Sequence, residues 1–260
     1  MRPRLLGVAF DGAGNFYVTN FSTGQLSLFD NNGLLVNSNI LSSTFTSIES
    51  ISFNNAGQML VGRADGDEDV RLVGTNGTIF DQYNVATGDR GSDWVDLAAD
   101  QKTLYYTSEG SIVYRYDLAT KTQLPNFATG LTRPLFALRL LSDGGLLVAS
   151  GGGLVYRFNA AGAVVDTYNI GGFLFALNLD PDGTSFWTAN INSGQIYRYD
   201  IATGALINTF TAATPITGLA VFGEITQGGP QSGVPEPSTF ALSALGVALL
   251  VWRRQRSQAR

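Results

Sequence analysis

The strongest constraint on the fold of this 260-residue chain is an internal repeat that recurs five times. The copies align on a turn residue, which is Gly14, Gly57, Lys102, Gly144 and Gly183 in successive copies. These turn residues are 43, 45, 42 and 39 positions apart. A period of about forty residues indicates an array of similar supersecondary units, because each unit buries its apolar surface against its neighbours.

Each copy contains the same four parts. A short apolar run leads into a tight turn, and a second run rich in β-branched or aromatic residues follows; in the first copy these runs are Leu6–Phe10 and Phe16–Thr19. A third run, such as Gln25–Phe29, and a more polar fourth run, such as Ala163–Tyr168 in the fourth copy, complete the unit. Four short strands joined by hairpin turns predict an antiparallel meander.

Four strands in about 42 residues match one blade of a β-propeller. One four-stranded sheet cannot bury both of its faces, whereas radial stacking covers each sheet with its neighbours. A β-sandwich is the alternative, but the recurrence of all four parts in five copies favours the propeller. We therefore predict an all-β propeller over residues 1–224, with five complete four-stranded blades and a partial sixth copy that supplies one strand at Thr217–Phe222. No stretch before residue 238 shows a sustained helical period.

Closure of the ring is the open question in this prediction. A propeller normally closes by combining strands from both ends of the chain in one blade, and residues 1–4 cannot supply the three strands that the sixth copy lacks. Residues 1–30 also contain no signal for export. We expect the genomic sequence upstream of Met1 to encode a signal peptide and the missing strands. A closed ring of five blades is the alternative.

The composition excludes several kinds of chemistry. Histidine and cysteine are both absent, so the chain cannot build a Ser-His-Asp or Cys-His nucleophile, a His/Cys zinc site or a disulfide. The net charge is −5, although the last eight residues hold four arginines. The acidic body lacks the basic stripe that binding to a nucleic-acid backbone requires, and we predict no nucleic-acid partner.

Two of the repeated runs carry a family resemblance. The second run of the first copy reads Tyr17-Val18-Thr19-Asn20, and the third run of the fifth copy, Ile196–Asp200, reads IYRYD. Together these runs resemble the YVTN, NHL and gluconolactonase-like β-propellers over residues 1–224. The resemblance implies a fold but no activity, because propellers host many unrelated functions.

One acidic loop suggests a metal site. Residues 65–69 read DGDED, and loops at this position meet near the mouth of the central channel. Asp65, Asp67 and Asp69 offer the carboxylate oxygens that calcium prefers, although the spacing of an EF-hand is not matched and a solvated acidic turn is the alternative. The gluconolactonase-like resemblance implies a Glu, an Asn and an Asp around one divalent metal, and Glu49, just before Ile51–Phe53, is the best candidate for that Glu. The other polar residues predicted near this face are Asp93, Asp96, Arg133, Asn190 and Asn192.

The C-terminal residues consist of three consecutive parts. These parts are the tripeptide Pro235, Glu236 and Pro237, an uncharged run at 238–252, and the arginines Arg253, Arg254 and Arg256. As a helix the uncharged run is about 22 Å long, against roughly 30 Å of hydrocarbon, and snorkelling arginines with an interfacial Trp252 recover part of the difference. The run lacks the polar face of an amphipathic docking helix. We therefore predict a single transmembrane helix at 238–252.

This tripartite arrangement resembles the PEP-CTERM sorting signal of Gram-negative bacteria. The resemblance implies recognition by an exosortase, which reads Pro235, Glu236 and Pro237, and it associates the protein with extracellular polysaccharide and biofilm. Arg253, Arg254 and Arg256 act as stop-transfer charge on the cytoplasmic side of the inner membrane, so the propeller lies outside it. The expected organisation is a propeller at 1–224, a linker at 225–234 and the sorting signal at 235–260.

These features predict an exported, surface-directed binding or scaffold protein with a polysaccharide or matrix protein as its partner. No convincing catalytic set is present, so binding is favoured over enzymatic activity. The alternative is a metal-dependent hydrolase of the lactonase type, with Ca²⁺ as its cofactor. A purely structural matrix protein is a third hypothesis, which differs from the binding protein only in having no ligand.

Overall fold

The computed structural model describes residues 5–41, 45–65, 69–132, 134–212, 216–224 and 226–229. It divides the chain into two units, Met1–Pro230 and Gln231–Arg260, and all of the described residues lie in the first. Within the described residues the structure contains twenty β-strands and no helix.

The strands form five antiparallel sheets, each built from four strands that follow one another along the chain. The first sheet contains β1 (Leu5–Phe10), β2 (Phe16–Asn20), β3 (Gln25–Phe29) and β4 (Leu35–Asn37). The second contains β5 (Ile48–Phe53), β6 (Met59–Arg63), β7 (Val70–Val73) and β8 (Ile79–Tyr83). The third contains β9 (Val95–Leu97), β10 (Thr103–Tyr106), β11 (Val113–Asp117) and β12 (Thr122–Ala128). The fourth contains β13 (Leu135–Leu140), β14 (Leu146–Ser150), β15 (Leu154–Phe158) and β16 (Val164–Asn169). The fifth contains β17 (Leu174–Leu179), β18 (Ser185–Asn190), β19 (Gln195–Asp200) and β20 (Leu206–Thr211).

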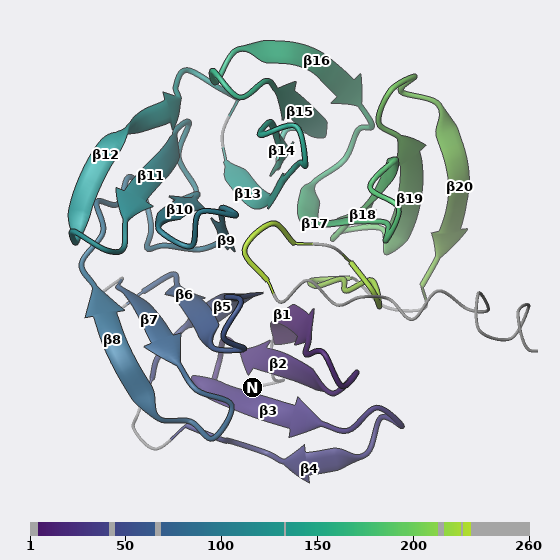
Figure 1. Cartoon of the computed structure of the whole chain (residues 1–260). Coiled ribbons are helices and arrows are strands. Elements are labelled where there is room, and N and C mark those ends of the chain that lie inside the picture. The colour runs from purple at the N-terminus through teal and green to yellow at the C-terminus, as the bar shows by residue number, and fades with distance from the viewer. Residues whose placement is uncertain are drawn as a thin grey trace, which may run out of the picture. The chain divides into compact units, whose positions relative to one another are not determined.

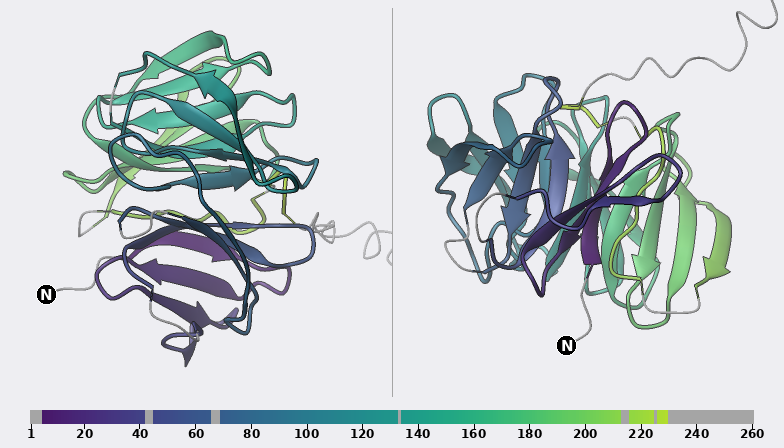
Figure 2. Two further views of the ribbon diagram at one scale, coloured as in Figure 1. Left: turned by 90° about the vertical axis from the view of Figure 1, so that its left-hand side faces the viewer. Right: turned by 90° about the horizontal axis from the view of Figure 1, so that it is seen from below.

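The five sheets are the blades of a propeller (Figure 1). The first strand of each blade is the innermost, and β5 contacts both β1 and β9 while β13 contacts both β9 and β17. Figure 2 shows the same blades from two further sides. The prediction of an all-β propeller with five complete four-stranded blades is confirmed.

Burial changes from the inner to the outer strand of a blade. All residues of β5, β13 and β17 are buried, whereas β4 and β20 are exposed along their whole length. The inner strands β13 (LFALRL) and β17 (LFALNL) are covered on both faces by neighbouring blades and are mainly apolar, whereas β5 (IESISF) carries polar residues that are buried as well. This change in burial explains why the first run is mainly apolar in most repeats and the fourth is more polar.

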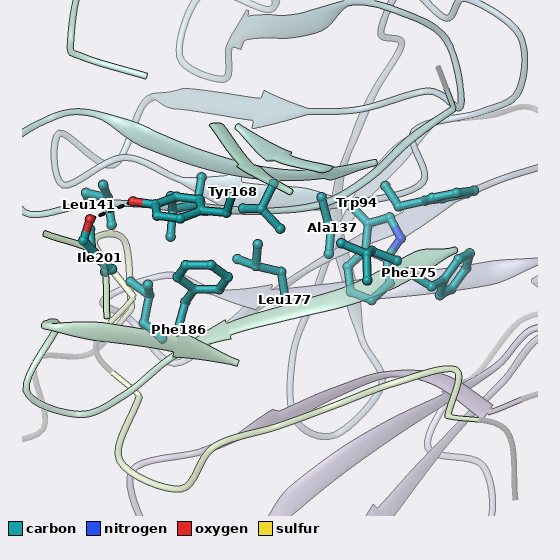
Figure 3. Packing of buried hydrophobic residues seen from close by; sticks show 14 of the residues in the cluster. Trp94, Ala137, Leu141, Tyr168, Phe175, Leu177, Phe186 and Ile201 are labelled. Atoms are coloured by element: carbon teal, nitrogen blue, oxygen red, sulfur yellow. Dashed lines mark hydrogen bonds between the residues drawn. The ribbon is translucent and has the colours of Figure 1, made fainter. Parts of the chain in front are cut away.

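Aromatic side chains fill the spaces between neighbouring blades (Figure 3). Tyr168 of β16 packs on Phe186 of β18 with ring centroids 5.0 Å apart, and its hydroxyl donates a hydrogen bond to the carbonyl oxygen of Ile201. Trp94, just before β9 of the third blade, meets Phe175 on β17 of the fifth blade edge to face at 5.7 Å, so aromatic packing also joins blades that are not neighbours. Each buried side chain of this size contributes roughly 1.5–3 kcal/mol, so these contacts are a main source of adhesion between blades.

The turn between the first two strands shows that the repeats align differently in the third blade. Gly14, Gly57, Gly144 and Gly183 all have a positive φ, between 68° and 82°. In the third blade the residue with that conformation is Gln101, with φ of 61°, rather than Lys102. The alignment on Lys102 was therefore wrong by one position, because the missing glycine hid the left-handed residue of this turn.

The segment after the fifth blade, residues 216–224 and 226–229, is called here the C-terminal segment. It contains no strand, so the prediction of a strand at Thr217–Phe222 is wrong. Thr217 instead donates a hydrogen bond to the Leu5 carbonyl oxygen, and Phe222 packs edge-on against Phe10 at 5.3 Å. Figure 1 shows this segment, in yellow-green, running between β1 and β17 near the centre of the ring. No further strand follows it among the described residues, so it has no hairpin partner and is held by side-chain contacts.

The last described residues also contact the propeller. Gln101 donates a 2.9 Å hydrogen bond from Nε2 to the carbonyl oxygen of Gly228. Gly228 lies so close to β9 that a Cβ there would be 2.4 Å from the Cβ of Leu97. Residues 226–229 fall within the expected linker, and in the structure they lie against the third blade.

Candidate functional site

Three carboxylates converge where the second and third blades meet. Glu49 is the second residue of β5, Asp93 lies two residues before β9, and Glu109 lies in the loop between β10 and β11. One carboxylate oxygen of each residue lies within 4.8 Å of the others. These three residues are called here the carboxylate cluster.

The backbone on both sides of the cluster is fixed by close contacts. The loop before β9 contacts the end of β6, where the Ser92 amide donates a 2.8 Å hydrogen bond to the Arg63 carbonyl oxygen. A Cβ on Gly91 would lie only 1.9 Å from that same oxygen, so only glycine fits there. On the other side, the Thr19 hydroxyl donates a 2.9 Å hydrogen bond to the Glu49 carbonyl oxygen. The positions of Glu49 and Asp93 are therefore set by rigid parts of two adjacent blades.

The deepest two carboxylates lack hydrogen-bond donors. Glu49 is 2% exposed and Asp93 is fully buried. Three oxygens accept no hydrogen bond from any described residue: Oδ1 and Oδ2 of Asp93 and Oε2 of Glu49. Burial raises the pKa of both carboxyl groups well above the usual range, and the charge of a neighbouring cluster member, Glu109 for Glu49 and Glu49 for Asp93, raises each pKa further. An uncompensated buried carboxylate costs several kcal/mol, so this arrangement requires protons or a cation.

Arg90 lies beside the cluster, but its guanidinium is bound mainly to Asp65. It donates from Nη2 to Oδ2 of Asp65 at 2.7 Å and from Nε to Oδ1 at 2.9 Å, and reaches Oε1 of Glu109 only at 3.4 Å. The hydrogen bond to Arg90 lowers the pKa of Asp65, and the same bond raises the pKa of Arg90. The guanidinium also lies over the ring of Phe21, 5.3 Å from its centroid. Arg90 therefore neutralises Asp65 at the rim, and its charge offsets the raised pKa of Glu49 and Asp93 only in part.

The described aspartates of the acidic loop have hydrogen-bond partners of their own. Asp65 pairs with Arg90 and also accepts a 3.1 Å hydrogen bond from the Ser47 hydroxyl. Asp69 accepts a hydrogen bond from the side chain of Gln82 on β8. Asp67 lies outside the described residues. The two described aspartates of the loop thus have different partners, and a metal role for the loop stays a prediction.

The other residues predicted near this face have mixed outcomes. Asp93 joins Glu49 in the cluster. Asp96 lies further along its strand and accepts hydrogen bonds from Ser52 Oγ at 3.1 Å and from the Leu140 amide at 2.9 Å. Asn190 accepts a 3.0 Å hydrogen bond from the amide of Asn192 within its own turn. Arg133 lies outside the described residues.

Glu49 and Asp93 occupy the same position in successive repeats, where the other three blades have apolar residues. Each lies eight positions before the positive-φ residue of its turn, Gly57 and Gln101. The residues at the same position in the first, fourth and fifth blades are Leu6, Phe136 and Phe175. The blade architecture therefore accepts apolar side chains there, and the two carboxylates are not required by the fold.

Sequence reasoning missed Glu109 and Arg90 as members of this site. In the alignment on Lys102, the residue equivalent to Glu49 is Trp94 rather than Asp93. The repeat position that Glu49 and Asp93 share was therefore not recognised. With the turn aligned on Gln101, two adjacent blades carrying an acid at one position would have been a visible signal. Glu109 and Arg90 lie in loops whose sequences are not repeated from blade to blade, and only the packing of the blades brings them to this place.

Comparison with known proteins identifies the second functional element, outside the described residues. The family description "PEP-CTERM protein-sorting motif" matches residues 233–256. The chain carries a PEP-CTERM sorting motif. This confirms the predicted signal, and the match includes every residue predicted for it: Pro235, Glu236, Pro237, Arg253, Arg254 and Arg256.

The PEP-CTERM motif implies an exported protein that is sorted by an exosortase and passes through a membrane-anchored transit state to the cell surface. The predicted membrane helix at 238–252 lies outside the described residues. Among the residues that are described, no helix is long and apolar enough to cross a membrane.

Solved structures share the fold of the propeller. A chain from the crystal structure of a nidogen/laminin complex matches with a TM-score of 0.70 and 14% sequence identity, covering 82% of this chain and 83% of that one. The WD40 β-propeller domain of Doa1 matches with a TM-score of 0.68 and 15% identity, covering 84% of this chain and 72% of that one. Identities this low show the fold alone. None of the curated proteins matches this chain.

Proposed function

We propose that this protein is a surface-directed binding module, which an exosortase processes at its C-terminus and which binds an extracellular polysaccharide or matrix protein through its propeller. The observation that carries the proposal is a sorting motif at 233–256 following a five-blade propeller. Blades present their loops on two faces, and such a rigid body suits ligand binding after export.

The proposed transit state has a defined orientation. The helix at 238–252 spans the inner membrane, and the arginines at 253, 254 and 256 stay on the cytoplasmic side because positive charge is retained there. The propeller then lies on the extracytoplasmic side. Residues 225–234 serve as the linker, and 235–260 is the part that the exosortase handles.

The sorting part of this proposal is tested with the full chain in a host with and without exosortase. Wild type should be shortened and reach the surface only where exosortase is present, and Glu236→Ala should remain full-length in the membrane. Arg260→Ala, outside the matched residues, is the control and should behave as wild type. Identical size and location of wild type in both hosts would refute sorting.

Ligand binding is tested separately on the processed protein. Pull-down with the polysaccharide and protein fractions of the host's own matrix should retain it on one of them. A protein that is sorted normally but retained on neither fraction would be a structural component without a ligand, and binding would be refuted while sorting stood.

A metal-dependent hydrolase of the lactonase type is the second candidate function, and the carboxylate cluster is the observation that favours it. A cation held by carboxylates can polarise an ester carbonyl and activate a water molecule. The test is turnover of simple lactones by the full chain with added CaCl₂ and with a chelator. Calcium-dependent hydrolysis supports this candidate, and absence of turnover at saturating calcium removes it.

A further inference from the structure

We propose that Glu49, Asp93 and Glu109 form a binding site for one divalent cation, of the oxygen-preferring kind exemplified by Ca²⁺, between the second and third blades. The proposal gives a cation and ligands to the site on which the hydrolase candidate rests, but it holds whether or not hydrolysis occurs. It is independent of the sorting motif.

The spacing of the three carboxylates fits a single ion. Calcium lies about 2.3–2.6 Å from its oxygen ligands, so ligand oxygens on opposite sides of the ion are about 5 Å apart. The cluster offers one oxygen from each residue, all within 4.8 Å of one another. One ion can therefore contact all three side chains with no movement of the backbone.

Unpaired buried oxygens provide the second, independent observation. Glu49 and Asp93 are more than nine-tenths buried, and their oxygens Oε2, Oδ1 and Oδ2 have no donor among the described residues. In native proteins nearly all buried polar atoms have a partner, so each exception needs an explanation, and binding of an ion is one that also compensates the charge. Because Leu6, Phe136 and Phe175 serve the fold at the same repeat position, architecture alone does not account for these acids.

The neighbouring positive charge does not replace a cation. Arg90 forms a two-pronged contact with Asp65 and lies 3.4 Å from Glu109, so it balances the charge at the rim. Glu49 and Asp93 lie deeper and have no such partner. A doubly charged ion between the three carboxylates would supply the compensation that Arg90 does not.

The donor set selects the class of metal. All three ligands are carboxylates, and the chain has no histidine or cysteine to favour zinc or copper. Glu109 is 25% exposed at its side chain while the other two are buried, so its side is the route to solvent. Three carboxylates leave coordination positions open for water or for oxygen atoms of a ligand on that side.

The test is calorimetric titration of the full chain, purified in detergent and freed of metal with a chelator, with CaCl₂ and then MgCl₂. We expect one calcium ion bound with a Kd below about 1 mM, the range of extracellular calcium modules. Glu49→Gln and Asp93→Asn each keep the side-chain volume and should weaken the Kd at least tenfold. Asp143→Asn is the matched control, because it removes an exposed carboxylate from a surface turn of the fourth blade and should leave the Kd unchanged.

Thermal unfolding with and without calcium distinguishes a variant that has lost the binding site from one that does not fold. Without calcium, Glu49→Gln and Asp93→Asn should melt at or above the temperature of wild type, because each removes a buried charge. With calcium, the melting temperature of wild type and Asp143→Asn should rise, and that of the two cluster variants should stay the same. Absence of calcium binding by wild type at about 10 mM, or an unchanged Kd in both cluster variants, would overturn the proposal.

Discussion

Arg139 on β13 donates a 2.9 Å hydrogen bond from Nε to Oε1 of Glu224 in the C-terminal segment, and the two side chains are only 7% and 10% exposed. Glu224 also accepts hydrogen bonds from Asn178 Nδ2 at 2.7 Å and from the Leu179 amide at 2.6 Å, both on β17. The Glu224 carboxylate thus attaches the C-terminal segment, which precedes the sorting motif, to the inner strands of the fourth and fifth blades. This contact gives the first prediction.

Glu224→Ala should destabilise the propeller by about 3–5 kcal/mol, because it leaves the buried Arg139 charge without its partner. The measurement is urea unfolding of the full chain in detergent. Replacing both partners, as in Arg139→Met with Glu224→Leu, should recover only part of the loss, because the fully buried Asp96 then loses the positive charge of Arg139. A loss below about 1 kcal/mol for Glu224→Ala would mean that the ion pair does not fasten the segment.

Gly218→Ala should also destabilise the fold, through contact with the first blade. A Cβ at this position would lie 1.8 Å from the carbonyl oxygen of Leu6, which is backbone and cannot move aside cheaply. We expect a loss of about 1–3 kcal/mol, seen as a lower melting temperature. Gly12→Ala is the matched control, since a Cβ there meets nothing within 4 Å and should change stability by less than about 0.5 kcal/mol. Equal melting temperatures for the two variants would show that the segment does not pack on β1.

Thr107→Val should weaken the junction of the third and fourth blades. The Thr107 hydroxyl, buried between them, donates a 2.8 Å hydrogen bond to the Phe136 carbonyl oxygen. Valine has nearly the same shape but no donor, and an unsatisfied buried carbonyl costs about 1–3 kcal/mol. Thr107→Ser keeps the hydroxyl and should retain most of the stability in urea unfolding. If the valine variant is as stable as wild type, the hydrogen bond contributes nothing to the junction.

Stability should fall in acid because aspartates in surface turns hold their protons weakly in the folded state. Backbone amides donate to Asp117, Asp182 and Asp200 and lower the pKa of each carboxyl below its ordinary value of 3.8. A lowered folded-state pKa gives stability that is present above pH 3.8 and is lost as the pH falls through the lower folded value. The urea midpoint should therefore drop as the pH is taken below about 4.

The matched variant for this pH effect is Asp117→Asn combined with Asp200→Asn, which keeps the turn acceptors and removes two of the titrating groups. Its urea midpoint should vary less with pH than that of wild type over the same acidic range. An unchanged pH dependence would assign the acid sensitivity to other carboxylates.

Much of this protein can be predicted from short-range sequence patterns. Runs such as Leu135–Leu140 and Leu146–Ser150, separated by a turn at Gly144, indicate strand pairs because alternation, turn chemistry and repeat length are all local properties. The sorting motif is equally predictable, since Pro235 to Arg256 form a continuous signal in the sequence.

The tertiary structure decided the rest because its determinants are distant in sequence. Glu49, Asp93 and Glu109 meet only because radial packing brings two blades together, and no local pattern encodes that distance. The position of residues 216–224 depends on contacts with Leu5, Arg139 and Leu179, which come from three different blades. Local hydrogen bonding and turn geometry are written in neighbouring residues, whereas the pairing of buried charges depends on which surfaces the blades cover when they stack.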